Sequence, residues 1–111
     1  MKNPYLKKKV KKESVVEKYL KQEVEKRGGQ VRKVSFPGHN GAPDRLIMMP
    51  GVLIWVELKS ETGVLSVLQH REHAFMISMG QPVQVIRKTE TVDELIDLMV
   101  KISDEYIERN R

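Results

Sequence analysis

The chain contains no cysteine among its 111 residues. Disulfide bonds, cysteine-ligated zinc sites and thiolate nucleophiles are therefore excluded. Aromatic residues make up only 5% of the chain, which argues against a protein built on base-stacking platforms. No apolar run comes near the roughly 20 residues of a membrane span, and no apolar secretory stretch follows the basic N-terminus. We therefore expect a cytoplasmic protein that has no membrane partner.

Acidic residues are missing from the first 12 positions, which hold six lysines. The formal net charge of +5 comes from this segment, because the remainder of the chain is close to neutral. A basic arm over residues 1–12 is suited to a phosphate backbone or an acidic surface, and a solvated tail is the alternative. The lysines of the arm are Lys2, Lys7, Lys8, Lys9, Lys11 and Lys12.

The pattern after the arm predicts one α/β domain over residues 13–111. Apolar spacing, glycine and proline breaks and capping residues predict the order α-β-β-β-α-β-α. A capping-box pattern at Thr91 marks the start of the last helix. The other predicted elements are a helix over 14–27, strands over 30–36, 45–49 and 52–59, a helix over 66–79 and a strand over 82–87.

The dipeptide Pro50-Gly51 determines which residues face each other across the predicted hairpin. With a loop of two or four residues, opposed residue numbers add up to 101, and Asp44 then lies opposite Glu57. Directly opposed side chains have Cβ atoms roughly 5 Å apart, and like charges in that position are destabilising. The two-residue period of a strand also places Lys59 on the face of Glu57. The hairpin thus brings two carboxylates and an ammonium group to one end.

The repulsion between Asp44 and Glu57 needs a compensating positive charge. A divalent cation supplies it, and Mg²⁺ typically takes one or two carboxylates together with water and substrate phosphate. Alternatively, Lys59 alone neutralises the pair, or a different register leaves Asp44 as a loop cap. Gly38 and Gly41 in the preceding loop would let a phosphate backbone approach closely, although a plain connecting loop explains them too.

Three short segments carry a family resemblance: Gly-Ala-Pro-Asp-Arg at 41–45, Trp-Val-Glu-Leu-Lys at 55–59 and Leu-Ser-Val-Leu-Gln at 65–69. In this order and spacing they resemble the virus-type replication-repair nuclease (VRR-NUC) domain, a branch of the PD-(D/E)XK nuclease superfamily. The similarity extends from about Glu13 to the last helix and matches the stand-alone, phage-like form. It implies a restriction-endonuclease-like αβββαβ core with a mixed sheet flanked by helices, plus a C-terminal helix.

The resemblance also implies the residues of a nuclease site. Asp44, Glu57 and the backbone carbonyl of Leu58 would bind Mg²⁺ or Mn²⁺. Lys59 would orient or help to deprotonate the attacking water and offset charge on the scissile phosphate. Glu17 corresponds to an acidic residue that the family carries on its first helix as an outer metal ligand.

Two of the implied site residues have structural alternatives. Glu17 closes a capping-box pattern that begins at Ser14, and Gln69, which the family places beside the active centre, closes another that begins at Ser66. Glu13, one helical turn from Glu17, is the fallback for the helix acid.

The resemblance implies DNA contacts outside the catalytic set. Lys33 matches a lysine near the substrate backbone, and an exposed strand lysine is the alternative. His73, one turn beyond Gln69, would help to bind phosphate, whereas an isolated histidine is more often structural or solvated. The arm lysines Lys7, Lys8, Lys9, Lys11 and Lys12 would add further phosphate contacts.

These inferences predict a Mg²⁺- or Mn²⁺-dependent DNA endonuclease, and the resemblance to stand-alone members of the family implies that it resolves four-way (Holliday) junctions. Symmetric cleavage of a junction needs two sites, which a two-fold homodimer supplies. The host would be a bacterial cytoplasm if the protein is phage-encoded. The alternatives are a flap- or single-strand-directed nuclease, a general restriction-like enzyme, or a non-catalytic DNA-binding module of the same fold.

Overall fold

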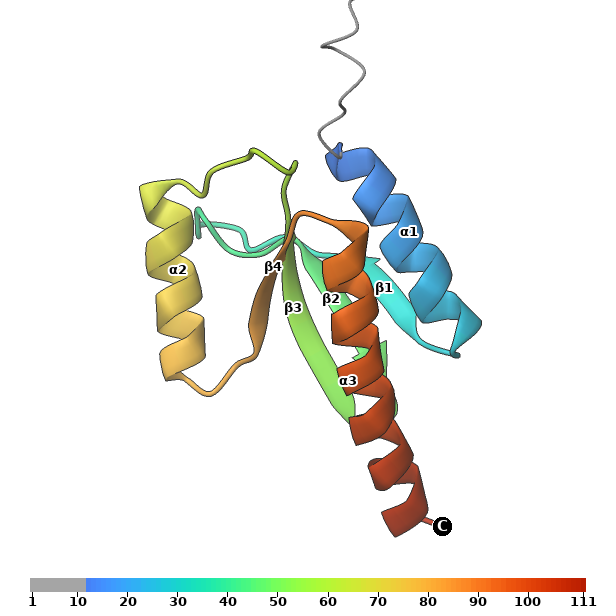
Figure 1. Ribbon diagram of the computed structural model, residues 1–111. Helices are drawn as coiled ribbons and strands as arrows, with labels where there is room; N and C mark the ends of the chain where they lie inside the picture. The colour runs from blue at the N-terminus through green and yellow to red at the C-terminus, as the bar shows by residue number, and fades with distance from the viewer. Residues whose placement is uncertain (1–11) are drawn as a thin grey trace, which may run out of the picture.

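A four-stranded mixed sheet organises residues 12–111, the part of the chain that the computed structural model describes (Figure 1). The sheet order is β1-β2-β3-β4, with β1, β2 and β3 antiparallel and β4 parallel to β3. The predicted αβββαβ core with a C-terminal helix is confirmed. Its elements are α1 (Glu13–Lys26), β1 (Gln30–Lys33), β2 (Arg45–Met49), β3 (Val52–Leu58), α2 (Val67–Ser78), β4 (Val83–Ile86) and α3 (Thr89–Arg109).

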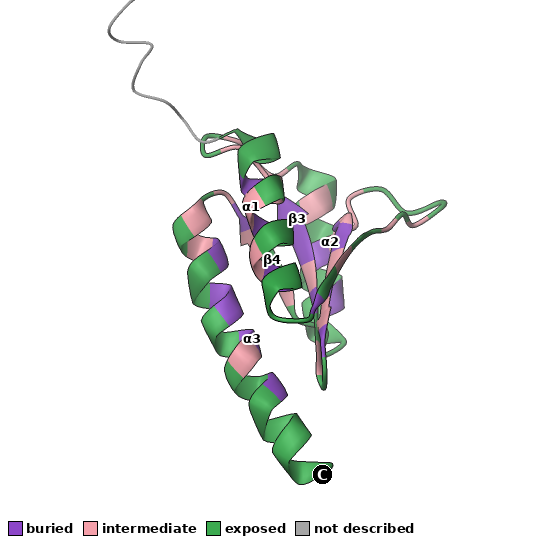
Figure 2. Cartoon of the chain, turned by 90° about the vertical axis from the view of Figure 1, so that its right-hand side faces the viewer, coloured by how far each residue is buried: buried purple, intermediate pink, exposed green. Residues whose placement is uncertain are grey.

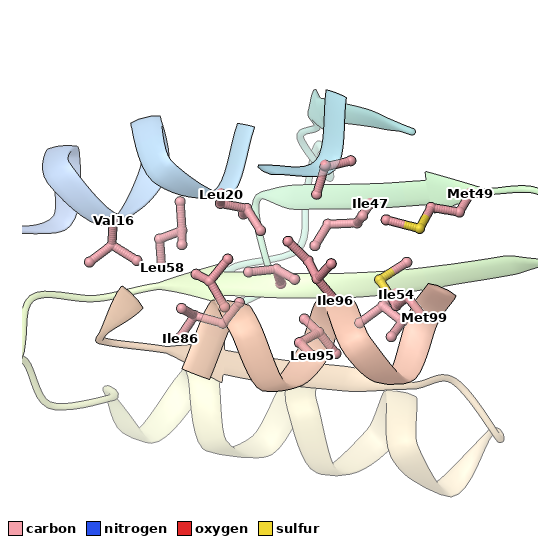
Figure 3. Close-up of a cluster of buried hydrophobic side chains, with 13 residues drawn as sticks. Val16, Leu20, Ile47, Met49, Ile54, Leu58, Ile86, Leu95, Ile96 and Met99 are labelled. Atoms are coloured by element: carbon pink, nitrogen blue, oxygen red, sulfur yellow. The ribbon is translucent and has the colours of Figure 1, made fainter. Parts of the chain in front are cut away.

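Helices α1 and α3 pack side by side on one face of the sheet (Figures 1 and 3). Strand β2 alternates strictly between buried and half-buried residues, as expected when one face of a strand lies on a core. Helix α1 buries one residue per turn at an i, i+4, i+8 spacing, and α3 contributes a matching stripe (Figure 2). The buried residues of this core include Val16, Leu20, Val24, Ile47, Ile54, Val56, Leu58, Ile86, Val92, Ile96 and Met99.

Helix α2 forms the crossover between the parallel strands β3 and β4 and packs near β4, apart from α1 and α3 (Figure 1). Only His73 and Met76 of α2 are buried, whereas Phe75, among other apolar residues of the helix, is exposed. Along β3, Trp55 and Glu57 alternate with core residues, so they belong to the sheet face opposite α1 and α3. This second face carries less apolar packing than the first.

The N-termini of the helices show which of the predicted capping boxes form. Helix α2 begins as predicted, with a capping box in which Ser66 and Gln69 exchange hydrogen bonds of 2.8 and 3.1 Å. The capping box predicted at Ser14 is wrong, because α1 already begins at Glu13 and Ser14 lies inside the helix. The one predicted at Thr91 is also wrong, because α3 begins at Thr89. Neither of these helices has a side-chain N-cap.

The tip of the β2–β3 hairpin is closed by the C-terminal part of α3. Gly51 has a φ of +75°, and a Cβ atom added there would collide with the side chain of Tyr106. Helix α3 therefore both covers the core and supports the turn. None of the helices in residues 12–111 combines the length and the apolar composition that crossing a membrane requires.

Candidate active site

The register predicted for the hairpin is confirmed. Arg45 pairs with Val56 and Met49 pairs with Val52, so opposed residue numbers add up to 101 throughout the ladder. The next pair beyond the last rung is Asp44 and Glu57. Both residues line a cleft of about 420 Å³. The cleft also contains Lys59 from the end of β3 and Ser66, Leu68 and Gln69 from the start of α2, with Asn40, Gly41 and Ala42 from the loop before β2.

A close backbone contact holds the loop before β2 against the start of α2. Gly41 has a φ of +91°, and a Cβ atom added there would overlap the carbonyl group of Leu68 and lie 2.8 Å from the amide nitrogen of Gln69. The other end of the loop is tied down by a hydrogen bond of 2.9 Å from the amide of Val34 to the carbonyl oxygen of Asp44. The glycine therefore lets the loop reach α2 and form one wall of the cleft.

Gln69 both caps α2 and lines the cleft, the two alternatives that the sequence left open. Its side-chain oxygen accepts a hydrogen bond of 2.8 Å from the amide of Ser66, which caps α2. The residue also lines the cleft. Because the oxygen is engaged in the cap, the amide nitrogen, a donor, is the group that Gln69 can offer to a molecule in the cleft.

Glu57 is buried, with only 6% of its surface exposed. Burial, and then the negative charge of Asp44, raise the pKa of Glu57 to about 7, while Lys59 acts in the opposite direction. On the α2 side, Nε2 of His73 lies 3.8 Å from a carboxylate oxygen of Glu57 and has no hydrogen-bond partner. Burial, and then the nearby His70 ring, lower the pKa of His73. The site therefore favours uncharged forms of both buried groups.

Asp44 has one engaged and one unengaged carboxylate oxygen. Oδ2 lies 2.9 Å from a guanidinium nitrogen of Arg45, whereas Oδ1 is inaccessible to solvent and has no hydrogen-bond partner. A second guanidinium nitrogen of Arg45 lies 2.9 Å from the carboxylate of Glu17 on α1. Arg45 thus joins the first helix to Asp44. Sequence reasoning missed this role, although strand alternation puts Arg45 on the core face with Ile47, an unusual place for a cation.

The two candidate acids of α1 have different surroundings. The carboxylate of Glu17 is paired with Arg45. The negative charge of Glu13 contributes to the raised pKa of Glu57, so Glu13 is the helix acid whose charge is felt at that carboxylate. Within residues 12–111, no three histidine, aspartate or glutamate side chains are grouped closely enough to hold a metal ion. Glu17, Asp44 and Glu57 therefore do not form a ready three-carboxylate set.

The donor groups at the end of the hairpin nevertheless fit a hard divalent cation. Asp44 and Glu57 supply carboxylate oxygens, the ligands that Mg²⁺ prefers, and Oδ1 of Asp44 has no donor from the protein. Burial contributes most to the raised pKa of Glu57, and the repulsion from Asp44, its second cause, is one that a cation would relieve. Leu58, whose carbonyl is the further predicted ligand, stands between Glu57 and Lys59 at the end of β3.

The residues predicted to contact DNA are distributed unevenly. Lys33 is exposed on the edge strand β1, opposite Arg45 in the register. His73 is buried beside Glu57 and does not lie on an open phosphate-binding surface. Lys12 is exposed and precedes the first residue of α1. The arm lysines Lys7, Lys8, Lys9 and Lys11 lie outside the described residues.

Comparisons with known proteins extend these observations. No family model matches the chain. A protein of Acyrthosiphon pisum secondary endosymbiont phage 1, named "Putative nuclease p44", is 41% identical over 75 residues, which are 67% of this chain and 81% of that protein. A solved structure described as "VRR_NUC domain" is 42% identical, with a TM-score of 0.71, and the match covers 78% of this chain and 96% of that one. The sequence comparison and the structure comparison therefore indicate the same kind of protein.

Proposed function

The chain belongs to the VRR-NUC family of nucleases, and from this premise we propose that it is a Mg²⁺- or Mn²⁺-dependent DNA endonuclease that cuts four-way junctions. The observation that carries the proposal is that Asp44, Glu57 and Lys59 line one cleft. The register of the hairpin places the two acids opposite each other. Two converging carboxylates with a neighbouring lysine suit phosphodiester hydrolysis.

In this proposal, Asp44, Glu57 and the carbonyl of Leu58 hold the cation. When bound, the cation polarises a phosphoryl oxygen and lowers the pKa of a coordinated water. Lys59 offsets negative charge on the scissile phosphate and orients the attacking water, as a compact point charge. The amide nitrogen of Gln69 donates a hydrogen bond to the phosphate or to the water.

We assign the DNA affinity outside the cleft to positively charged side chains. Lys33 and the lysine-rich arm neutralise phosphates flanking the scissile bond. Each neutralised phosphate steepens the dependence of log K on log salt by about 0.9 for duplex DNA. Deletion of residues 1–12 should therefore flatten that dependence and leave the rate at saturating enzyme unchanged, because the arm acts on encounter.

Junction cleavage is proposed to use a two-fold homodimer, because each cleft cuts one strand and a junction needs two symmetric cuts. Helix α3 supports this proposal, because it exposes the apolar side chains of Leu98 and Ile102, which lie one helical turn apart. If the gene is carried by a phage, as that of the p44 relative is, the enzyme would act in the cytoplasm of the bacterial host.

The proposal is tested by incubating the purified full chain with linear, flapped, single-stranded and four-way DNA in Mg²⁺, Mn²⁺ or EDTA. We expect cation-dependent, paired nicks in the four-way substrate, and no cleavage by the near-isosteric variants Asp44→Asn and Glu57→Gln. Preferential cutting of flapped or single-stranded DNA would replace the junction assignment with the alternative nuclease activity. Binding without cleavage in every condition would identify a non-catalytic DNA-binding module instead.

A further inference from the structure

Arg45 occupies a position where an apolar residue is expected. Strand β2 turns Arg45, Ile47 and Met49 toward α1 and α3, and all three residues are buried. Only 9% of the Arg45 side chain is exposed. A buried guanidinium is costly unless carboxylates or other acceptors compensate its charge, so its partners indicate why it is there.

The partners of Arg45 lie on two sides. One nitrogen of the guanidinium fork lies 2.9 Å from Oδ2 of Asp44 and donates a hydrogen bond of 3.2 Å to the backbone carbonyl of the same residue. The other terminal nitrogen lies 2.9 Å from Oε2 of Glu17. The fork therefore binds Asp44 through both side chain and main chain, and it is itself anchored to α1.

This arrangement fixes one rotational state of the Asp44 carboxylate. With Oδ2 held by the guanidinium, Oδ1 is the oxygen left without a partner. Arginine presents its donors in a rigid planar fork, and lysine, a point charge on a flexible stem, cannot hold Asp44 and Glu17 at once with the same geometry. Residues that orient a ligating carboxylate commonly change metal affinity 10- to 100-fold when they are mutated.

We propose that Arg45 is a positioning residue that sets the Asp44 carboxylate for cation binding, and that Glu17 acts through Arg45 and is not itself a ligand. The inference rests on the proposed function, because it takes Asp44 as a cation ligand. It replaces the outer-ligand role expected for Glu17 with an ion pair that tethers α1 to the site.

The first test compares Arg45→Lys with Arg32→Lys in the full chain, with Mn²⁺ titrated by calorimetry. Arg32 is exposed on the neighbouring strand and bonds only Gln30 among the contacts seen, so it is the matched control. Because lysine keeps the positive charge, a 10-fold or greater loss of Mn²⁺ affinity in Arg45→Lys alone would support orientation by the fork. Wild-type affinity in Arg45→Lys would overturn the proposal, since charge would then suffice.

The second test is a double-mutant cycle that separates the two roles of Glu17. Glu17→Gln should weaken Mn²⁺ binding several-fold in the wild-type background and less than two-fold in an Arg45→Met background, because its route to Asp44 is already broken. An equal loss in both backgrounds would show that Glu17 binds the cation directly and would overturn the proposal. The side chain of Glu17 is partly exposed, so we expect Glu17→Gln to fold even if Arg45→Met does not.

The failure of this inference is distinguishable from the failure of the proposed function. Wild-type protein that binds no Mn²⁺ overturns both. Wild-type protein that binds Mn²⁺ and cleaves DNA, with Arg45→Lys indistinguishable from it, overturns the positioning role alone. Thermal unfolding of each variant is recorded alongside, and Mn²⁺ affinities are compared at a temperature at which every variant is folded, because Glu17→Gln removes one of the carboxylates that compensate the buried guanidinium.

Discussion

The two ends of the β2–β3 hairpin are built for opposite purposes. At the turn, apolar residues face each other, as in the pair Met48 and Leu53, and Gly51 lies directly under Tyr106 of α3. At the open end, the same register places Asp44 beside Glu57, two groups that repel each other. One continuous ladder thus fastens the hairpin at one end and forces like charges together at the other.

This difference shows how a small protein can tolerate an unfavourable arrangement. Antiparallel pairing offers no freedom to slip by one residue at the open end without exposing the core face of both strands. The turn, the apolar pairs and the packing of α3 therefore supply the stability that the acid pair lowers. Substitutions at the open end should change chemistry more than stability, and substitutions at the turn should do the reverse.

The largest effect is expected at the open end, from Lys59→Ala. The rate of cleavage at saturating DNA should fall by about 10²–10⁴-fold, because the proposed function gives this lysine a role in proton transfer and charge stabilisation. DNA affinity and Mn²⁺ affinity should stay close to wild type, as measured by fluorescence anisotropy and calorimetry. Lys33→Ala is the control, for which affinity should fall and the rate persist. A rate loss that merely follows DNA affinity would make Lys59 a phosphate contact.

Gly41→Ala should separate the cleft wall from the rest of the fold. The added methyl group overlaps the carbonyl of Leu68, so the loop must move away from α2, and a displacement of about 1 Å can cost on the order of 10²-fold in rate. Gly38→Ala is the matched control, because Gly38 also has a positive φ of +80° but no atom within 4 Å of an added Cβ. Equal activity of the two variants would show that the loop contact does not shape the site.

Gly51→Ala tests the turn end. Its positive φ and the collision with Tyr106 should lower the free energy of unfolding by roughly 2 kcal/mol, and the folded protein should keep its Mn²⁺ affinity. Gly28→Ala shares the strained backbone, at a φ of +79°, without a crowding neighbour, and should cost less. Chemical denaturation gives both values. If the two alanine variants were equally stable, the contact with Tyr106 would contribute nothing.

Glu57→Gln should stabilise the metal-free protein increasingly as pH rises from about 4.5 to about 7. The pKa of Glu57 is about 7 in the folded protein, against 4.5 for an ordinary glutamate, so between these values the folded state retains a proton that the unfolded state releases. The free energy of unfolding of the wild type should therefore fall as pH rises between these values. In EDTA, the variant should gain roughly 1 kcal/mol more at pH 8 than at pH 4, because a pKa difference of this size is worth about 3 kcal/mol at most and solvent in the open cleft screens a large part of it. A gain that does not change with pH would indicate improved packing.

The features that sequence predicted well are those that depend on neighbours along the chain. A turn dipeptide and the two-residue period of a strand were enough to place Asp44 opposite Glu57 and Lys59 in the same cleft. The capping box of α2 is equally local, because Ser66 and Gln69 bond to each other's backbone.

The features that sequence did not predict depend on how separate elements pack. The ion pair between Arg45 and Glu17 exists only because α1 lies on the core face of β2. The burial of His73 beside Glu57 likewise depends on where the crossover helix rests on the sheet. The caps expected at Ser14 and Thr91 do not form, because each helix begins before the residue that could have capped it.

The residues that line the cleft all fall between Asn40 and Gln69, and this has a consequence for how the protein folds. Contacts between residues close in sequence cost little loop-closure entropy and tend to form early. The acid pair can therefore meet as soon as the hairpin forms, before the N-terminal helix has docked. The guanidinium of Arg45, in contrast, finds Glu17 only once that helix is in place. We therefore expect the acid pair to be present but unrestrained early in folding, and to be held by Arg45 only after α1 has docked.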